Sequence, residues 1–318
     1  TNRTWIITIS LALWSAFTAA SGLAANFTQL FLARVGVGVG EAGGVAPAYS
    51  LITDYFPKRE RARALAVYSF GIPVGSATGI ILGGILASII NWRVAFFAVG
   101  ALGLLVAPLF RALVREPQRG RFDSATTHEP ASILAIARSL ATKPSFWLLS
   151  LGGASSSLMG YGLFFWMPSF LLRSYHLPLR EVSFFYASIL LIGGVIGIWL
   201  GGALADWLGK SNRRAFALLP AAAFVLALPC YVLGLLSPSL TAAFFLFLPP
   251  TALGLAWLGP VITAIQHLVA PSMRSTASAL FLFINNLLGL GAGTFIIGAL
   301  SDALTRRFGE EALRYSIL

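Results

Sequence analysis

Charged residues and cysteine are both scarce in this chain, and each shortage limits what it can be. Only 10% of the 318 residues are charged, whereas 57% are hydrophobic, and the mean hydropathy is +0.82. An average soluble domain carries about 25% charged residues. The single cysteine, Cys230, excludes a disulfide framework and a cysteine-based metal cluster. We therefore expect a protein that lies in a membrane.

Long apolar segments fill most of the sequence. Each is close to the roughly 20 residues that an α-helix needs to cross a bilayer. Nine segments run over approximately 5–23, 27–54, 62–90, 93–113, 145–173, 182–208, 213–236, 240–268 and 275–303. A tenth begins near Ala312. The predicted fold class is an all-α polytopic membrane protein, since a membrane β-barrel would show short alternating segments.

The basic residues are unevenly distributed among the predicted loops. If the first segment starts on the cytoplasmic side, most of the 22 Lys and Arg residues fall in cytoplasmic loops. This asymmetry is the positive-inside signal of membrane proteins. The net charge of +11 therefore reflects topology, and we expect no nucleic-acid partner. We predict a multi-pass protein of the cell (inner) membrane.

A polar, proline-bearing stretch divides the chain. Residues 116–143 are predicted to be a cytoplasmic linker, in which ASILAIARSLATK forms a short amphipathic helix at the membrane surface. Residues 1–115 then make an N-terminal bundle, and residues 144–318 make a C-terminal bundle. Four apolar segments precede the linker and five follow it. If the linker joins two six-helix halves, two helices are missing before Thr1 and most of one after Leu318.

Glu41 is the least expected residue of the second apolar segment. It and Arg34 are the only charged residues between Arg3 and Asp54. An ionisable side chain inside an apolar span is energetically costly and marks a functional site. Seven residues at 100° each place both on one helix face, about 10 Å apart, which strains a direct pair. We therefore expect Glu41 and Arg34 to form part of a functional site; the alternative is a structural ion pair.

The third apolar segment carries small residues at regular spacing. Gly75, Gly79 and Gly83 recur every four residues after Pro73, which removes one backbone hydrogen bond. Small residues let helix backbones approach closely in membranes. We therefore expect a tight packing face with a bend near Pro73, and packing explains this pattern better than ligand binding does.

A charged pattern closes the sixth segment. The run GGALADWLGKSNRR places Asp206 at a helix end, next to a short basic loop that includes Arg213 and Arg214. Hydrogen bonds between this carboxylate and the arginines would latch two helices in one conformation. A merely solvated loop end is the alternative.

These patterns resemble those of a known superfamily. The run GALADWLGKSNRR resembles the loop signature of the major facilitator superfamily, and the glycine helix with Arg34 resembles its fourth-helix motif. Within that superfamily, GVGEAGGVAPAYSLITDYFP, YSFGIPVGSATG, GYGLFFWMPSFLL and VAPSMRSTASALFLFINNLLGLGAG are similar to the spinster family. The resemblance implies two six-helix bundles with an alternating-access cavity between them. It also implies a sphingolipid-like or lysophospholipid-like substrate.

The superfamily's geometry implies which segments line the cavity, namely 27–54, 145–173 and 240–268. The expected substrate-binding residues on these and neighbouring segments are Tyr68, Ser157, Tyr161, Phe165, Trp166, Trp257 and Asn286. Aromatic side chains together with a few polar ones suit an amphipathic molecule. For any single aromatic residue, an ordinary core-facing or lipid-facing position is the alternative. Because Asn285 and Asn286 point about 100° apart, we expect only one of them to face the cavity.

Catalytic patterns are missing from the sequence, which has no HExxH, GxSxG or Walker A run. We therefore expect no enzyme activity, no cofactor and no metal site. The resemblance implies proton-coupled secondary transport of an amphipathic, lipid-like molecule by a monomer in the bilayer, and we expect Glu41 and Arg34 to be the proton-coupling residues. One alternative is a proton-driven transporter of small organic anions or drugs. Another is a non-transporting receptor or scaffold in which Arg34 and Glu41 are structural.

Overall fold

The computed structural model describes residues 2–118, 122, 132–209, 215–269 and 273–318. Over these ranges the chain forms α-helices with short 3-10 and π-helical segments, and it contains no strand. The predicted all-α class is thereby confirmed. The chain divides into two compact units, Thr1–Thr126 (unit 1) and Thr127–Leu318 (unit 2), each of which is described by itself.

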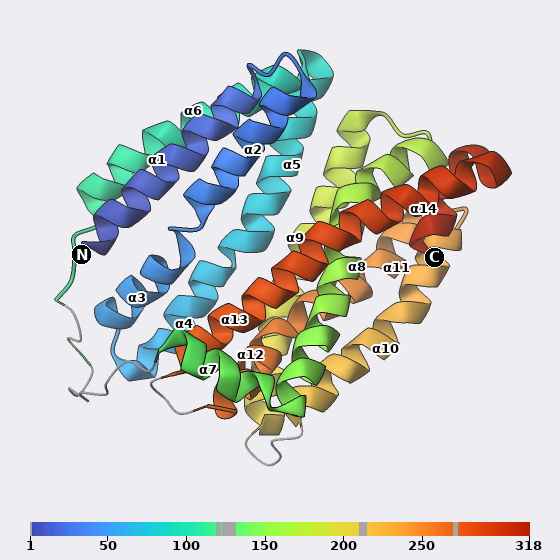
Figure 1. Cartoon of the computed structure of the whole chain (residues 1–318). Helices are drawn as coiled ribbons and strands as arrows, with labels where there is room; N and C mark the ends of the chain where they lie inside the picture. Colours follow the sequence, from blue (N-terminus) through green and yellow to red (C-terminus); the bar gives the residue numbers. More distant parts are fainter. Residues whose placement is uncertain (1, 119–121, 123–131, 210–214, 270–272) are drawn as a thin grey trace. The chain divides into compact units, whose positions relative to one another are not determined.

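Unit 1 is built around α1, which packs along both α2 and α6 (Figure 1). Its helices are α1 (Arg3–Ser21), α2 (Phe27–Glu41), α3 (Val45–Tyr55), α4 (Lys58–Ser69), α5 (Gly71–Ile89) and α6 (Trp92–Leu113). The side chains of Asn2, Asn26 and Asn91 accept hydrogen bonds from backbone N–H groups of the first turns of α1, α2 and α6. These N-caps satisfy donors that a helix start otherwise leaves unpaired, and so they fix where the three helices begin.

Two of the predicted spans are interrupted. The segment 27–54 is split into α2 and α3 by a turn at residues 42–44, and the segment 62–90 is split at Phe70. The second interruption lies three residues before Pro73, which agrees with the predicted bend. The first lies in the run of small residues that follows Glu41, so Glu41 is the last residue of its helix.

The predicted glycine packing face of the third segment is not occupied by the described residues. A Cβ atom added at Gly75, Gly79 or Gly83 would meet no heavy atom within 4 Å. Close helix approach in unit 1 occurs elsewhere: a Cβ at Gly100 would lie 2.5 Å from the backbone nitrogen of Ala19. Spacing alone shows that a helix face is small, but not that a neighbouring helix packs there.

Unit 2 is the larger unit, and its long helices run mostly side by side (Figure 1). Its elements are α7 (Ile133–Ala141), α8 (Pro144–Ser174), α9 (Leu179–Gly209), α10 (Ala215–Leu236), α11 (Leu240–Ala256), α12 (Leu258–His267), α13 (Arg274–Asn286), the π-helix η2 (Leu287–Ala292), α14 (Gly293–Phe308), the 3-10 segment η3 (Gly309–Glu311) and α15 (Ala312–Ile317). Three successive elements, namely α13, η2 and α14, form a single rod (Figure 1). The predicted span 275–303 is thus continuous, with a π-helical segment inside it.

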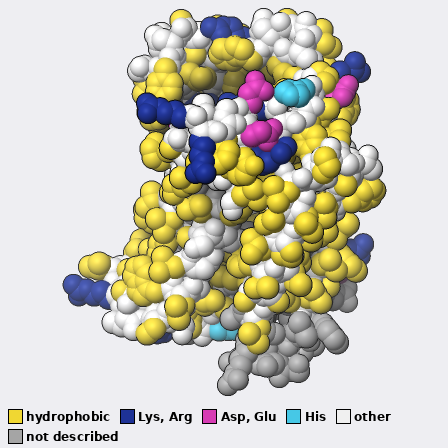
Figure 2. Space-filling model, turned by 90° about the vertical axis from the view of Figure 1, so that its right-hand side faces the viewer, with side chains coloured by type: hydrophobic (Ala, Val, Ile, Leu, Met, Phe, Trp, Pro, Cys, Tyr) yellow, Lys and Arg dark blue, Asp and Glu magenta, His cyan; other side chains and the backbone are white. Residues whose placement is uncertain are grey.

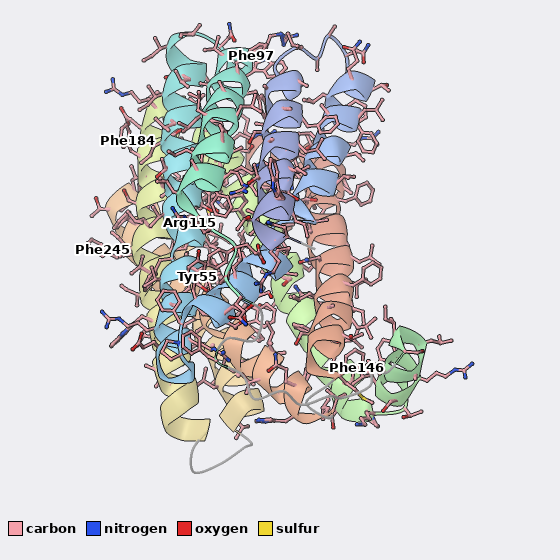
Figure 3. The ribbon with its side chains drawn as sticks, turned by 90° about the vertical axis from the view of Figure 1, so that its left-hand side faces the viewer. Tyr55, Phe97, Arg115, Phe146, Phe184 and Phe245 are labelled. Atoms are coloured by element: carbon pink, nitrogen blue, oxygen red, sulfur yellow. The ribbon has the colours of Figure 1, made fainter. Side chains whose placement is uncertain are left out.

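The linker contains a short helix, α7, whose apolar face packs against the rest of unit 2. Ile136 and Leu140 are 1% and 0% exposed, and they belong to a core cluster of unit 2 that includes Trp257 and Phe281. Phe146, labelled in Figure 3, is part of the same cluster. An amphipathic pattern requires an apolar surface to pack against, and here that surface is protein instead of lipid.

Among the described residues, eight helices are long and apolar enough to cross a membrane. Many of their large hydrophobic side chains are exposed, as expected for a surface that contacts lipid. Figure 2 shows one face of the molecule, on which hydrophobic side chains cover the middle and charged side chains gather toward the upper end. This distribution agrees with a polytopic membrane protein.

Candidate transport site

Glu41 lies on the free side of α2. Its side chain is exposed, while Gly36 and Gly40 on the same helix are buried. A Cβ at Gly40 would lie 2.7 Å from the backbone nitrogen of Trp14 in α1, so only glycine permits this approach. A Cβ atom added at Gly38 would meet no heavy atom within 4 Å. The glycine face therefore fixes α2 against α1, and Glu41, about 100° around the helix from Gly40, remains exposed.

Arg34 is also exposed on α2 and does not form an ion pair with Glu41. Its guanidinium carbon lies 5.9 Å from the centroid of the Phe96 ring in α6, within the range of a cation–π interaction. The expected strain of a direct Arg34–Glu41 pair agrees with this arrangement. Within the described part of the chain, no residue forms an ion pair or a hydrogen bond with the Glu41 carboxylate.

Tyr68 contributes an exposed phenol to unit 1. Its ring packs edge-on against Tyr49 of α3, with centroids 5.5 Å apart and an interplanar angle of 70°. Both rings are more than one-third exposed. The pair offers an aromatic surface with two hydroxyl groups, although no described contact joins it to Glu41.

Ser157 is buried in unit 2 and fastens α8 to α13. Its hydroxyl donates a 2.9 Å hydrogen bond to Oδ1 of Asn285, which is itself 4% exposed. Asn286 is exposed, so the two adjacent asparagines do point in different directions. The structure thus places Ser157 with Asn285 in the interior and leaves Asn286 on the surface of unit 2.

The predicted aromatic residues of unit 2 have four different environments. Tyr161 is half-buried, and Phe165 is exposed one turn further along α8. The Trp166 indole donates a 2.9 Å hydrogen bond to the carbonyl of Thr294, which fixes it against α14. Trp257 is buried among Phe224 and Phe281 in the core cluster. Tyr161 and Phe165 therefore present an accessible aromatic surface, whereas Trp257 is surrounded by protein.

The predicted latch lies outside the described residues. Arg213 and Arg214 fall in an undescribed stretch, and the side chain of Asp206 is likewise not described. Among the described residues, no group of three or more His, Cys, Asp and Glu side chains is placed to hold a metal ion.

One end of unit 1 holds a buried network of charged side chains that was not predicted from the sequence. Arg3 Nη1 donates to Asp54 Oδ2 at 2.5 Å, and Arg3 Nε donates to Glu116 Oε1 at 2.7 Å. The Ser50 hydroxyl accepts from Nη1 at 2.7 Å. The side chains of Arg3 and Asp54 are only 4% and 7% exposed. This Arg3 network (Arg3, Asp54 and Glu116) joins α1, α3 and the segment after α6.

Glu116 lies beyond the end of α6, and the network favours the charged form of its carboxyl group. Burial alone would raise the pKa of this carboxyl, but hydrogen bonds from the Arg3 guanidinium and the Thr4 N–H hold its pKa below the usual 4.5. Glu116 is the only acidic residue between Glu60 and Asp123. That isolation was a signal of a specific partner, but it did not identify Arg3.

Comparison with known proteins identifies the superfamily of this chain. The family model of the Major Facilitator Superfamily matches residues 1–294. The chain belongs to the Major Facilitator Superfamily. This superfamily consists of transporters, so the chain is a multi-pass membrane protein of a transporter superfamily.

Relatives within the Major Facilitator Superfamily specify the family further. An MFS-type efflux pump from Mycolicibacterium smegmatis is 36% identical over 309 residues, covering 97% of this chain and 71% of the pump. Protein spinster homolog 1 from Bos taurus is 34% identical over 327 residues, covering 96% of this chain and 62% of that protein. The chain thus spans less than two thirds of the bovine relative. It is a member of the spinster family.

Solved structures agree with this assignment to the spinster family. The chain is similar to the crystal structure of a bacterial homolog to the human lysosomal transporter spinster, in an inward-facing and unoccupied conformation. The TM-score is 0.84 at 31% identity, with 100% of this chain and 79% of that chain covered. The inward-facing and occupied structure gives a TM-score of 0.80 at 32% identity.

Proposed function

We propose that this transporter moves an amphipathic, lipid-like anion and couples that movement to protons through Glu41. The observation that carries the proposal is the position of Glu41. It is an exposed carboxylate on the free side of α2, in the middle of an apolar stretch, and it has no partner among the described residues. An unpaired acid at this depth is expected to have a function.

Protonation of Glu41 would change the energy of a transport cycle. A carboxylate in an apolar environment is costly, whereas the neutral acid is tolerated much better. Conformations that expose Glu41 to water therefore favour the charged form, and conformations that cover it favour the protonated form. Proton binding would in this way shift the equilibrium between inward-open and outward-open states.

Arg34 is proposed to receive the charged end of the substrate. Its guanidinium lies against the Phe96 ring, is exposed and has no carboxylate partner in the described part of the chain. An arginine of this kind binds a phosphate or carboxylate in a planar, two-point geometry. The neutral form of Glu41 would leave Arg34 as the only charge of α2, ready for an anion.

The apolar part of the substrate would contact the accessible aromatic side chains. Tyr68 with Tyr49 in unit 1, and Tyr161 with Phe165 in unit 2, are the best placed by exposure. Ser157 and Trp166 would support α8 through their hydrogen bonds to Asn285 and Thr294. Trp257 would act from the core and Asn286 from the surface, so we expect a smaller direct role for Trp257.

A small organic anion or drug is the second candidate substrate. It is favoured by the name of the relative from Mycolicibacterium smegmatis, which is an MFS-type efflux pump. Both candidates share the same proposed setting: the cell (inner) membrane, with residues 116–143 on the cytoplasmic side and a monomer as the working unit. They differ in the length of the apolar part of the substrate.

The test is a transport assay in proteoliposomes with an imposed pH gradient. We expect uptake of labelled lysophospholipid, and we expect little uptake of a short-chain organic anion of equal charge. The opposite preference would replace the lipid-like substrate with the second candidate. If no amphiphile is moved under any gradient, the protein acts as a receptor or scaffold and the proposal fails.

A further inference from the structure

The α1–α6 pair in unit 1 brings a tryptophan and an arginine together near two helix ends. The guanidinium carbon of Arg111 lies 5.0 Å from the ring centroid of Trp5. Trp5 is 50% exposed and stands within one turn of the start of α1, and Arg111 is two residues from the end of α6. Tryptophan and arginine near helix ends are typical of the membrane–water interface.

The hydrogen-bonding capacity of Arg111 is not used by the protein. Its Nε atom is buried and has no hydrogen-bond partner among the described residues. The nearby carboxylates of Asp54 and Glu116 are both engaged by Arg3. Arg115 adds a second exposed cation, and its carbonyl accepts a 2.5 Å hydrogen bond from the Tyr55 hydroxyl (Figure 3). This Arg111 corner (Trp5, Arg111 and Arg115) thus carries positive charge without a described counter-charge.

Exposed apolar side chains of α1 and α6 continue from this corner and form the apolar surface beside it. Ile9 follows Trp5 by one turn and is 59% exposed, while Leu104 and Pro108 precede Arg111 along the same side of α6 and are also exposed. This side of α1 is free within unit 1. Trp14, which packs against α2, is nine residues from Trp5, and nine steps of 100° point the two side chains in opposite directions.

We propose that the Arg111 corner and the apolar surface beside it bind one anionic phospholipid of the cytoplasmic leaflet. The phosphate would accept hydrogen bonds from Arg111 and be attracted by the charge of Arg115, and one acyl chain would lie along Ile9 and Pro108. Two arginines that form no described ion pair favour an anionic over a zwitterionic headgroup. A free phosphate would gain nothing from the apolar surface. The site is distinct from Glu41, and its leaflet rests on the proposed topology.

The test is native mass spectrometry of the purified protein in detergent, with phosphatidylglycerol or phosphatidylcholine added. The wild-type protein is expected to retain phosphatidylglycerol in preference to phosphatidylcholine. Arg111→Ala should lower the affinity for phosphatidylglycerol about tenfold, since a charge-assisted two-point contact is lost. Arg111→Lys, which keeps the charge but not the planar geometry, should give a smaller loss and covers the case in which the alanine variant fails to fold.

Arg307→Ala is the matched control, because Arg307 also lies over an aromatic ring, 5.3 Å from the centroid of Phe308, near the end of another helix. It should leave lipid binding unchanged. Equal retention of the two lipids by the wild type, or equal binding by wild type and Arg111→Ala, overturns the proposal. Binding in detergent requires no transport, so its failure is separate from a failure of the proposed function. Glycerol phosphate that displaces the lipid at equal concentration would show that the apolar surface is not part of the site, and would also overturn the proposal.

Discussion

Two regions of unit 1 hold charged side chains in opposite ways. At one end, Arg3 and Asp54 are buried and joined at 2.5 Å, with Glu116 completing the network. Midway along the α2–α3 stretch, Arg34 and Glu41 are exposed and form no pair with each other. A buried charge must be paired to be tolerated, whereas an accessible charge is available to bind a ligand or a proton. The first region holds helices together, and the second is the one that we propose acts in transport.

The largest effect is expected from breaking the buried network. Arg3→Ala leaves the buried Asp54 carboxylate without its cation, and removing one partner of a buried pair costs about 3–5 kcal/mol. Thermal unfolding in detergent, followed by tryptophan fluorescence, should show a large drop in the melting temperature. Arg34→Ala is the control and should cost no more than about 1 kcal/mol, the value of an exposed cation–π contact. Similar losses in the two variants would remove the distinction between the regions.

The second effect concerns the glycine face that presents Glu41. Gly40→Ala would place a Cβ atom 2.7 Å from the backbone of Trp14, so α2 must move away from α1. Overpacking of this kind costs about 1–3 kcal/mol. Gly38→Ala is the matched variant in the same helix, since nothing lies within 4 Å of that position. We expect only Gly40→Ala to lower the melting temperature; equal effects would mean that α2 is not held through its glycines.

A smaller effect is expected when the network is titrated. The pKa of Glu116 is lowered in the folded protein, so the unfolded chain takes up this proton at a higher pH. The stability that Glu116 contributes is therefore complete above its ordinary pKa of 4.5 and is lost as the pH falls through the lower folded value. As the pH falls through this window, the free energy of unfolding obtained from melting curves should decrease more for the wild type than for Glu116→Gln, by about 1 kcal/mol. Parallel curves would contradict the assignment.

The sequence predicted local features of both regions better than it predicted contacts. Hydropathy located eight of the nine predicted spans, whereas 27–54 forms two shorter helices. The run of small residues after Glu41 coincides with the turn that ends α2. Nothing in the segment around Arg3 shows that it meets Asp54, 51 residues away, or Glu116, 113 residues away. Periodicity is a property of one helix, whereas a network of this kind depends on which helices become neighbours.

The same limit applies to α7 and to the glycines of α5. The apolar face of α7 could be recognised from its spacing, but Ile136 and Leu140 pack against unit 2 and not on lipid. Gly75 and Gly79 were correctly seen as small, yet no described neighbour approaches them. In a membrane protein, both a lipid-facing and a core-facing surface are apolar, so composition does not distinguish them.

The central claim is that Glu41 carries the coupling proton, and Glu41→Gln tests it most directly. In proteoliposomes, substrate uptake driven by a pH gradient is compared with exchange of internal for external substrate at equal pH. Glu181→Gln, at an exposed acid near the start of α9, is the control. We predict that Glu41→Gln loses gradient-driven uptake, keeps exchange and melts like the wild type. Gradient-driven uptake that is undiminished in Glu41→Gln would contradict the account.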